Sequence, residues 1–225
     1  MGLKHNFCIN DSLFYVAGAV IGDGCLYNSG KYYYLIILNG TEGFVRKYAK
    51  HLQTCSDSKI NIFYRKSHNV WEARTNNKKL FKFLLQIKKN SWKIFEYVNG
   101  FDNASLLFLE GFFDAEGCVK IIKEPVRITP KICLDMTNTN LEYLEVCRCL
   151  LDCCLGIKGN YSIQKEGVAK DGVLRKKCYH LRIYKKDYVR TFFSNINTVK
   201  LYKEKRKYVK NWLALNKFKH SNNSY

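Results

Sequence analysis

One short motif occurs twice in this chain and constrains its fold more than any other feature. Residues 15–27 read YVAGAVIGDGCLY, and residues 107–119 read LFLEGFFDAEGCV. Each is a helical pattern that ends in an acid followed by glycine, and the acids are Asp23 and Glu116. The C-terminal end of a helix carries partial negative charge, so a carboxylate is unfavourable there. Two copies, 93 positions apart, indicate an internal duplication and a function for both acids.

The elements predicted along the chain support a duplication. After its motif helix, the first half shows strands at 31–39, 59–66 and 70–75 and helices at 42–55 and 77–89. The second half shows strands at 118–123, 131–138, 160–166 and 177–185 and helices at 141–154, 187–196 and 201–215. We predict an α+β fold with a first half at 1–100, including a linker from residue 90, a second half at 101–216, and a disordered tail at 217–225.

Small residues on the motif helices predict how the two halves meet. They recur four positions apart in both helices, as Gly18 with Gly22 and as Gly111 with Ala115. Such a stripe lets two helices approach closely, which would bring the C-terminal acids, Asp23 and Glu116, side by side. A divalent cation relieves the repulsion between two carboxylates, and an open oxygen site suits Mg²⁺. A centre of this kind is able to activate water for phosphodiester hydrolysis.

The charge of the chain points to a polyanionic partner. Its formal net charge is +19, which favours nucleic acid or an anionic membrane. The longest apolar stretch, residues 13–22, is too short to span a bilayer, and no cleavage site of a signal peptide follows it. We therefore predict a nucleic-acid partner and no membrane, and an intracellular protein. It would be cytoplasmic in a prokaryote or archaeon, and an organelle stays open in a eukaryote.

The ten cysteines include a cluster, CRCLLDCC, at residues 147–154. Structural zinc sites need a second pair of ligands at a matching spacing, which this cluster lacks. We expect these thiols to be small apolar core groups in a reducing compartment. Structural zinc is the weaker alternative, and a disulfide stays open.

The motifs resemble those of a known family. VAGAVIGDG (16–24) and LEGFFDAEG (109–117) look like the paired motifs of LAGLIDADG homing endonucleases in their single-chain form, and the order of elements agrees from about residue 11 to 215. The resemblance implies two αββαββα halves, motif helices packed at the centre, and antiparallel sheets that form a saddle over double-stranded DNA. It also implies a monomer that hydrolyses both strands of a long asymmetric target and leaves short 3′ overhangs.

The resemblance also implies a metal centre. Asp23 and Glu116 match the catalytic acids that bind Mg²⁺, with Mn²⁺ or Ca²⁺ as substitutes for binding, and the carbonyls of Gly22 and Ala115 match further ligands. The first motif departs from the family in having Ile21 in place of an acid. The second has Glu116 where the family has an aspartate, which keeps a carboxylate on a longer arm.

Further catalytic groups are expected around the acids. Asn39 and Thr137 match a polar residue that the family places at the end of the second strand of each half. Lys200 and Lys203 match a basic residue that the family often places near the final helix of a half, although a solvated helix face or a phosphate contact is the favoured alternative for each lysine.

Strand alternation selects candidates for DNA contacts, because side chains on one face of a two-stranded ribbon fit the major groove. Arg65, Arg74, Arg182 and Gln164 are the first choices for base contacts, with an exposed strand residue as an equal alternative for each. The full set is Asn61, Arg65, Arg74, Lys131, Asp135, Gln164, His180, Arg182 and Tyr184.

Two other functions fit the same fold. One is a maturase, which would bind intron RNA and assist splicing. The other is a DNA-binding protein without cleavage. The presence of both acids argues against a simple loss of cleavage.

Overall fold

The computed structural model describes residues 8–98, 103–123, 130–168, 172–201 and 203–215. The first half contains α1 (Asp11–Asp23), β1 (Gly24–Asn28), β2 (Tyr33–Asn39), α2 (Glu42–Cys55), β3 (Asn61–Arg65), β4 (Val70–Asn76) and α3 (Lys78–Lys89). The second half contains α4 (Asn103–Glu116), β5 (Gly117–Ile122), β6 (Lys131–Asn138), α5 (Leu141–Leu155), β7 (Asn160–Gln164), β10 (Cys178–Ile183), α6 (Lys186–Asn195) and α7 (Lys203–Leu215). The predicted α+β fold is confirmed.

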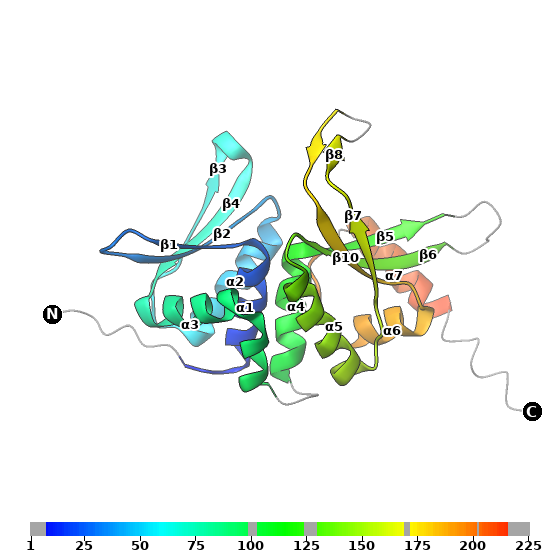
Figure 1. The fold of residues 1–225 in the computed structure, drawn as a ribbon, viewed down its shortest axis with the longest axis horizontal. Helices are drawn as coiled ribbons and strands as arrows, with labels where there is room; N and C mark the ends of the chain where they lie inside the picture. Colours follow the sequence, from blue (N-terminus) through cyan, green and yellow to red (C-terminus); the bar gives the residue numbers. More distant parts are fainter. Residues whose placement is uncertain (1–7, 99–102, 124–129, 169–171, 202, 216–225) are drawn as a thin grey trace, which may run out of the picture.

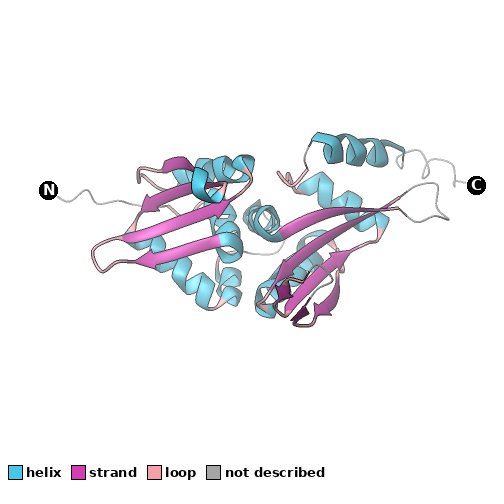
Figure 2. Cartoon of the chain, turned by 90° about the horizontal axis from the view of Figure 1, so that it is seen from above, coloured by secondary structure: helices cyan, strands magenta, loops and turns pink. Residues whose placement is uncertain are grey.

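Each half has a four-stranded antiparallel sheet, in the order β1-β2-β4-β3 and β5-β6-β10-β7. Figure 1 shows α1 and α4 at the centre, with α3, α5 and α6 below the two sheets. Figure 2 shows the sheets on either side of the centre and α7 beside the second sheet. Sequence periodicity missed β1, because five residues that begin with glycine give little alternation. It also missed the small ribbon of β8 (Gly167–Val168) and β9 (Leu174–Arg175), which lies within a predicted loop.

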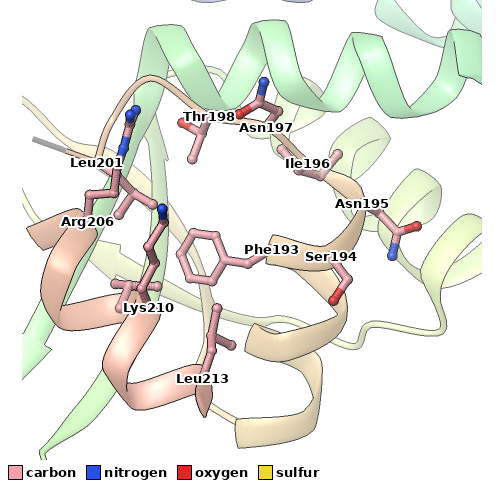
Figure 3. Close-up of a pocket in the computed structure, with 11 residues that line it drawn as sticks. Phe193, Ser194, Asn195, Ile196, Asn197, Thr198, Leu201, Arg206, Lys210 and Leu213 are labelled. Atoms are coloured by element: carbon pink, nitrogen blue, oxygen red, sulfur yellow. The ribbon is translucent and has the colours of Figure 1, made fainter.

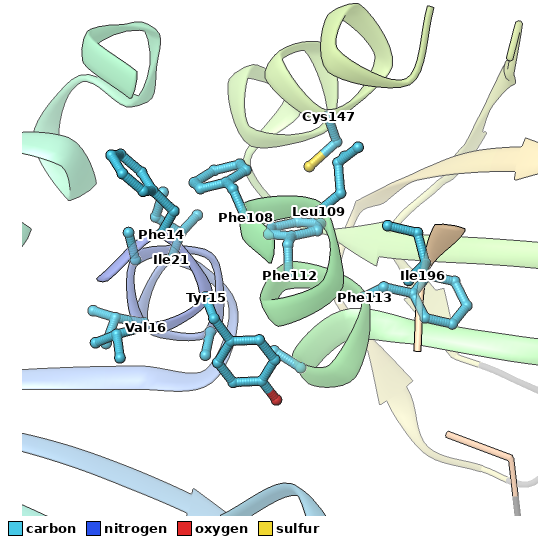
Figure 4. Packing of buried hydrophobic residues seen from close by; sticks show 14 of the residues in the cluster. Phe14, Tyr15, Val16, Ile21, Phe108, Leu109, Phe112, Phe113, Cys147 and Ile196 are labelled. Carbon is cyan, nitrogen blue, oxygen red and sulfur yellow. The ribbon is translucent and has the colours of Figure 1, made fainter. Parts of the chain in front are cut away.

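The two motif helices pack against each other without a layer of side chains where the glycines lie. A Cβ atom on Gly18 would lie 2.1 Å from the Phe108 carbonyl oxygen, and one on Gly111 would lie 2.1 Å from the Tyr15 carbonyl oxygen. Figure 4 shows aromatic side chains of both helices packed around this contact. The predicted central packing of the motif helices is confirmed.

A buried polar cluster joins the two halves beside these helices. The carboxylate of Asp114 on α4 accepts hydrogen bonds from the Tyr15 hydroxyl (2.9 Å), Thr198 Oγ1 (2.5 Å) and the Val199 amide (2.9 Å). Lys47 of α2 lies 2.8 Å from Asp114 and 2.6 Å from Glu110. This single ammonium therefore compensates two buried carboxylates and links α2 of the first half to α4 of the second.

We expect Lys47→Met to lower the free energy of unfolding by about 2 kcal/mol, because it leaves two buried carboxylates without a cation. Urea denaturation measures the effect. Lys50→Met is the matched control, since Lys50 is exposed on the same helix, and it should change stability by less than about 0.5 kcal/mol. Equal stability of the two variants would contradict the role given to Lys47.

The remaining expectations about the chain concern cysteines, membranes and the tail. No disulfide joins the cysteines, and within the described ranges no three His, Cys, Asp or Glu side chains come together as a structural zinc site would need. Among the described helices, none has the length and apolar character needed to cross a bilayer. The predicted tail at 217–225 lies outside the described residues.

Candidate active site

The two acids meet where the motif helices end. Each helix passes directly into the first strand of its own sheet, at Gly24 and Gly117, so Asp23 and Glu116 lie between the sheets. The helices are close here too, because a Cβ on Gly22 would lie 2.5 Å from the Cβ of Ala115. Both acids are half-buried.

The surroundings of the acids disfavour two negative charges. Burial raises the pKa of Glu116 to about 7, and the nearby charge of Asp23 contributes to the rise. Burial also raises the pKa of Asp23, against the hydrogen bond from Asn39. The carboxylates therefore need a nearby positive charge to be ionised together at neutral pH.

An asparagine holds each acid. Asn39 Nδ2 donates to Asp23 Oδ2 and Asn138 Nδ2 donates to Glu116 Oε1, both at 2.8 Å. The counterpart of Asn39 is thus Asn138, which corrects the match to Thr137. The Thr137 hydroxyl instead pairs with His180 Nδ1 at 2.9 Å.

The error has a physical cause. Both asparagines end a strand and accept a hydrogen bond through Oδ1 from the amide two residues later, at Thr41 and at Asn140. These two residues are the N-caps of α2 and α5. Counting two residues back from the helix N-cap therefore identifies the equivalent asparagine in each half, which the position of a strand end alone does not.

A lysine from each half approaches the helix ends. Lys200 Nζ donates to the carbonyl oxygen of Ala115 at 2.8 Å. Lys88, on α3, donates to the carbonyl oxygens of Val20 (3.2 Å) and Gly24. Both ammonium groups lower the pKa of the two acids, against the effect of burial. The side chain of Lys203 lies outside the described residues.

A basic residue was predicted near the final helix of a half, but candidates were named only in the second half, so Lys88 on α3 was missed. Applying the duplication would have found it, because a lysine in the second half implies one at the end of the first half. The carbonyl oxygen of Ala115, a predicted metal ligand, accepts the hydrogen bond from Lys200 Nζ. A carbonyl oxygen has two lone pairs, so it is able to accept a second partner.

The outward face of the first sheet presents arginines over a buried acid. Glu72 on β4 is buried, and it forms ion pairs with Arg65 on β3 and with Arg74, whose Nε lies 2.8 Å from it. The two arginines predicted to contact DNA in this half are therefore held side by side. Asn61, opposite Arg74 on β3, is exposed.

The second sheet has a similar arrangement on Asp135. Asp135 is buried and pairs with Lys120, with His180 Nδ1 (3.0 Å) and with Arg182 Nε (3.3 Å). Asp135 and His180 were predicted to contact DNA, but in the free protein both lie below the surface, where they hold their basic neighbours. Arg182 is partly exposed.

The other predicted contacts lie at or just beyond strand ends. Tyr184, just beyond β10, is exposed, and Gln164 and Lys131 are partly exposed at strand ends. A cavity of about 430 Å³ lies elsewhere, between α6 and α7 (Figure 3). Neither acid lines it.

The comparisons with known proteins agree with this fold. Residues 103–197 match a family model described as a LAGLIDADG-like domain. Structures of the homing endonuclease I-DmoI superpose with a TM-score of 0.59, at 22% identity, over 83% of this chain and 95% of that one. The chain has the two-motif LAGLIDADG fold.

A LAGLIDADG domain of a second protein, DUF199/WhiA, has the same fold. The N-terminal LAGLIDADG domain of DUF199/WhiA superposes with a TM-score of 0.58, at 15% identity, over 88% of this chain and 86% of that one. Two uncharacterized proteins of Methanocaldococcus jannaschii are relatives in sequence: MJ0314 is 29% identical over 76% of this chain, and MJ0398 is 30% identical over 80%. The chain spans 64% of the length of each.

Proposed function

We propose that this LAGLIDADG chain is a metal-dependent endonuclease that hydrolyses both strands of a long, asymmetric double-stranded DNA site. The observation that carries the proposal is the pair of acids, Asp23 and Glu116, at the crossing of the motif helices. Each acid has its own asparagine and a lysine nearby. The fold alone does not require an acid, an asparagine and a lysine at the end of each motif helix. Hydrolysis of one phosphodiester in each DNA strand would require such a set twice.

The residues fit a divalent cation. Two half-buried carboxylates supply hard oxygen donors, and because burial raises the pKa of both, a bound cation would favour the ionised pair. Because the protein offers few ligands, a bound Mg²⁺ would keep positions for water and phosphate oxygens, as Mg²⁺ prefers. When bound, such an ion lowers the pKa of a water nucleophile and stabilises the leaving oxygen. Structures of I-DmoI with DNA and Ca and with DNA and Mn are consistent with this proposal.

The protein groups around the acids would orient and stabilise the reacting atoms. Asn39 and Asn138 fix one oxygen of each carboxylate, which leaves the other oxygen for a ligand. Lys88 and Lys200 place positive charge beside the same centre, where a phosphodiester gains negative charge in the transition state. One such set in each half provides for one cut in each strand.

The two sheets would hold the duplex. The net charge of +19 supplies attraction to phosphates, and the arginines on Glu72 and Asp135 present hydrogen-bond donors to base edges. Since the two halves differ in sequence, we expect an asymmetric site read by a monomer.

The proposal is tested with a randomised duplex library. Wild-type protein is incubated with the library and Mg²⁺, and the ends of cleaved molecules are sequenced. We expect double-strand cuts with short 3′ overhangs within one consensus sequence. Tight binding of a consensus in Ca²⁺ without cleavage in Mg²⁺ or Mn²⁺ would contradict the endonuclease, and would favour the DNA-binding alternative.

The lysines give a separate prediction. Lys88→Met and Lys200→Met should each slow single-turnover cleavage by about 100-fold, the loss expected for one group that stabilises developing charge. Lys89→Met is the control, because Lys89 neighbours Lys88 on α3 and is exposed. Wild-type rates in both variants would remove the lysines from the mechanism.

A further inference from the structure

The outward faces of the two sheets differ in chemistry at equivalent positions. Strand pairing shows which positions are equivalent. Across the first sheet, from β2 through β4 to β3, Leu38, Glu72 and Phe63 lie side by side. Across the second sheet, from β6 through β10 to β7, Thr137, His180 and Ser162 do the same. Arg74 and Arg182 are equivalent in the same way, opposite Ile36 and Asp135. The two arginines, and the asparagines opposite them at Asn61 and Asn160, are thus shared by the halves, and other positions on this face differ.

Five positions on this face are apolar or aromatic in the first sheet and mostly polar in the second. We call the first set the apolar strip: Tyr27, Tyr34, Ile36, Leu38 and Phe63. Its counterparts in the second sheet are Lys120, Cys133, Asp135, Thr137 and Ser162. Tyr27, Leu38 and Phe63 are 53%, 40% and 38% exposed, so folding leaves this strip without a full cover.

The strip is continuous with the candidate active site. Leu38 precedes Asn39, which donates to Asp23, and Ile36 and Tyr34 follow at intervals of two residues away from the acids. Alternate residues on one face of a strand are about 6.8 Å apart, which equals two base-pair steps of about 3.4 Å. The guanidinium of Arg74 lies 5.4 Å from the centre of the Tyr34 ring and 6.0 Å from that of Phe63, so positive charge for a duplex accompanies the apolar side chains.

We propose that the apolar strip reads the C5-methyl groups of thymines in the major groove, so that the half-site under the first sheet is rich in A·T pairs. This inference rests on the proposed function. The thymine methyl is the apolar group that base pairs present in the major groove, and apolar side chains contact it. Stacking of single-stranded bases requires aromatic faces, whereas Leu38 and Ile36, the residues closest to the acids, are aliphatic. On the second sheet the basic groups that Asp135 holds, Lys120 and Arg182, would instead meet hydrogen-bonding groups of the other half-site.

The test uses a binding selection followed by removal of methyl groups. Wild-type protein selects duplexes from a randomised library in Ca²⁺, and each half of the enriched site is then made with deoxyuridine in place of thymidine. We expect deoxyuridine in one half to weaken binding about fourfold for each contacted methyl, and deoxyuridine in the other half to have no effect. The double variant Leu38→Ser/Phe63→Ser should lose this difference, and Thr137→Ser/Ser162→Ala, at the equivalent positions, should retain it.

The outcomes separate this inference from the proposed function. Failure to enrich any sequence would overturn both. An enriched sequence whose affinity does not depend on thymine methyls, or depends on them equally in wild type and in Leu38→Ser/Phe63→Ser, would overturn the inference alone. Sedimentation of the free protein tests a second copy of the chain as occupant, and a dimer that Leu38→Ser dissociates would also overturn it. Thermal unfolding confirms that the serine variants are folded.

Discussion

Asp23→Asn and Glu116→Gln should each reduce DNA cleavage at least about 1,000-fold and leave binding of the duplex within about threefold. Each replacement keeps the size of the side chain and a carbonyl oxygen that accepts the hydrogen bond from Asn39 or Asn138. It removes the negative charge that binds a divalent cation. Electrostatic stabilisation of a transition state contributes several kcal/mol in such sites, which corresponds to this loss of rate. Binding is retained because the sheets, rather than the acids, supply most contacts with DNA.

The measurement is single-turnover cleavage of the selected duplex in Mg²⁺, with binding measured in Ca²⁺. Asp57→Asn is the control, because Asp57 is an exposed acid in the first half, and it should cleave at the wild-type rate. The variants should also be at least as resistant to heat as the wild type, since removing one of two neighbouring half-buried charges relieves repulsion. Wild-type cleavage by either acid variant would contradict its assignment.

Gly18→Ala should lower the free energy of unfolding by about 3 kcal/mol. Alanine is a better helix former than glycine, so at a site with space the change would stabilise a helix by as much as about 1 kcal/mol. At Gly18 the new methyl group would lie 2.1 Å from the Phe108 carbonyl oxygen, so α1 and α4 have to separate, and overpacking in a core is destabilising. Separation of the helices should also reduce cleavage, because it moves the two acids apart.

Gly43→Ala is a matched control for this prediction. Gly43 lies in the first turn of α2, and a Cβ there meets nothing within 4 Å. The control should be neutral or more stable than the wild type, and urea denaturation of both variants gives the comparison. Equal stabilities of Gly18→Ala and Gly43→Ala would show that the motif helices do not pack as described.

Much of the fold was predictable because the duplication is visible in local patterns. The glycine–acid motifs located both central helices, and the stripe of small residues at Gly18 and Gly111 indicated that these helices are in contact. The positions of Asp23 and Glu116 follow from that contact, since an acid at the end of each helix is carried to the crossing.

Features that depend on pairing between distant segments were not predictable in this way. Asn138 lies against Glu116 because β6 pairs with β5 and ends two residues before the N-cap of α5. Lys88 approaches the centre because α3 packs beside α1. The alternation of Asp135 with apolar residues correctly predicted that it lies on the outward face. Its burial was not predictable, because it is covered by Lys120 and Arg182 from the neighbouring strands β5 and β10.

The central claim is that Asp23 and Glu116 together form one divalent-cation centre, and Mn²⁺ binding tests it most directly. Electron paramagnetic resonance counts the ions bound tightly to the complex of protein and selected duplex, for wild type and for Asp23→Asn/Glu116→Gln. We expect Mn²⁺ bound to the wild-type complex, and none bound tightly to the complex of the double variant, which still holds DNA. Equal Mn²⁺ binding by the two complexes would contradict the assignment of these acids to a metal centre.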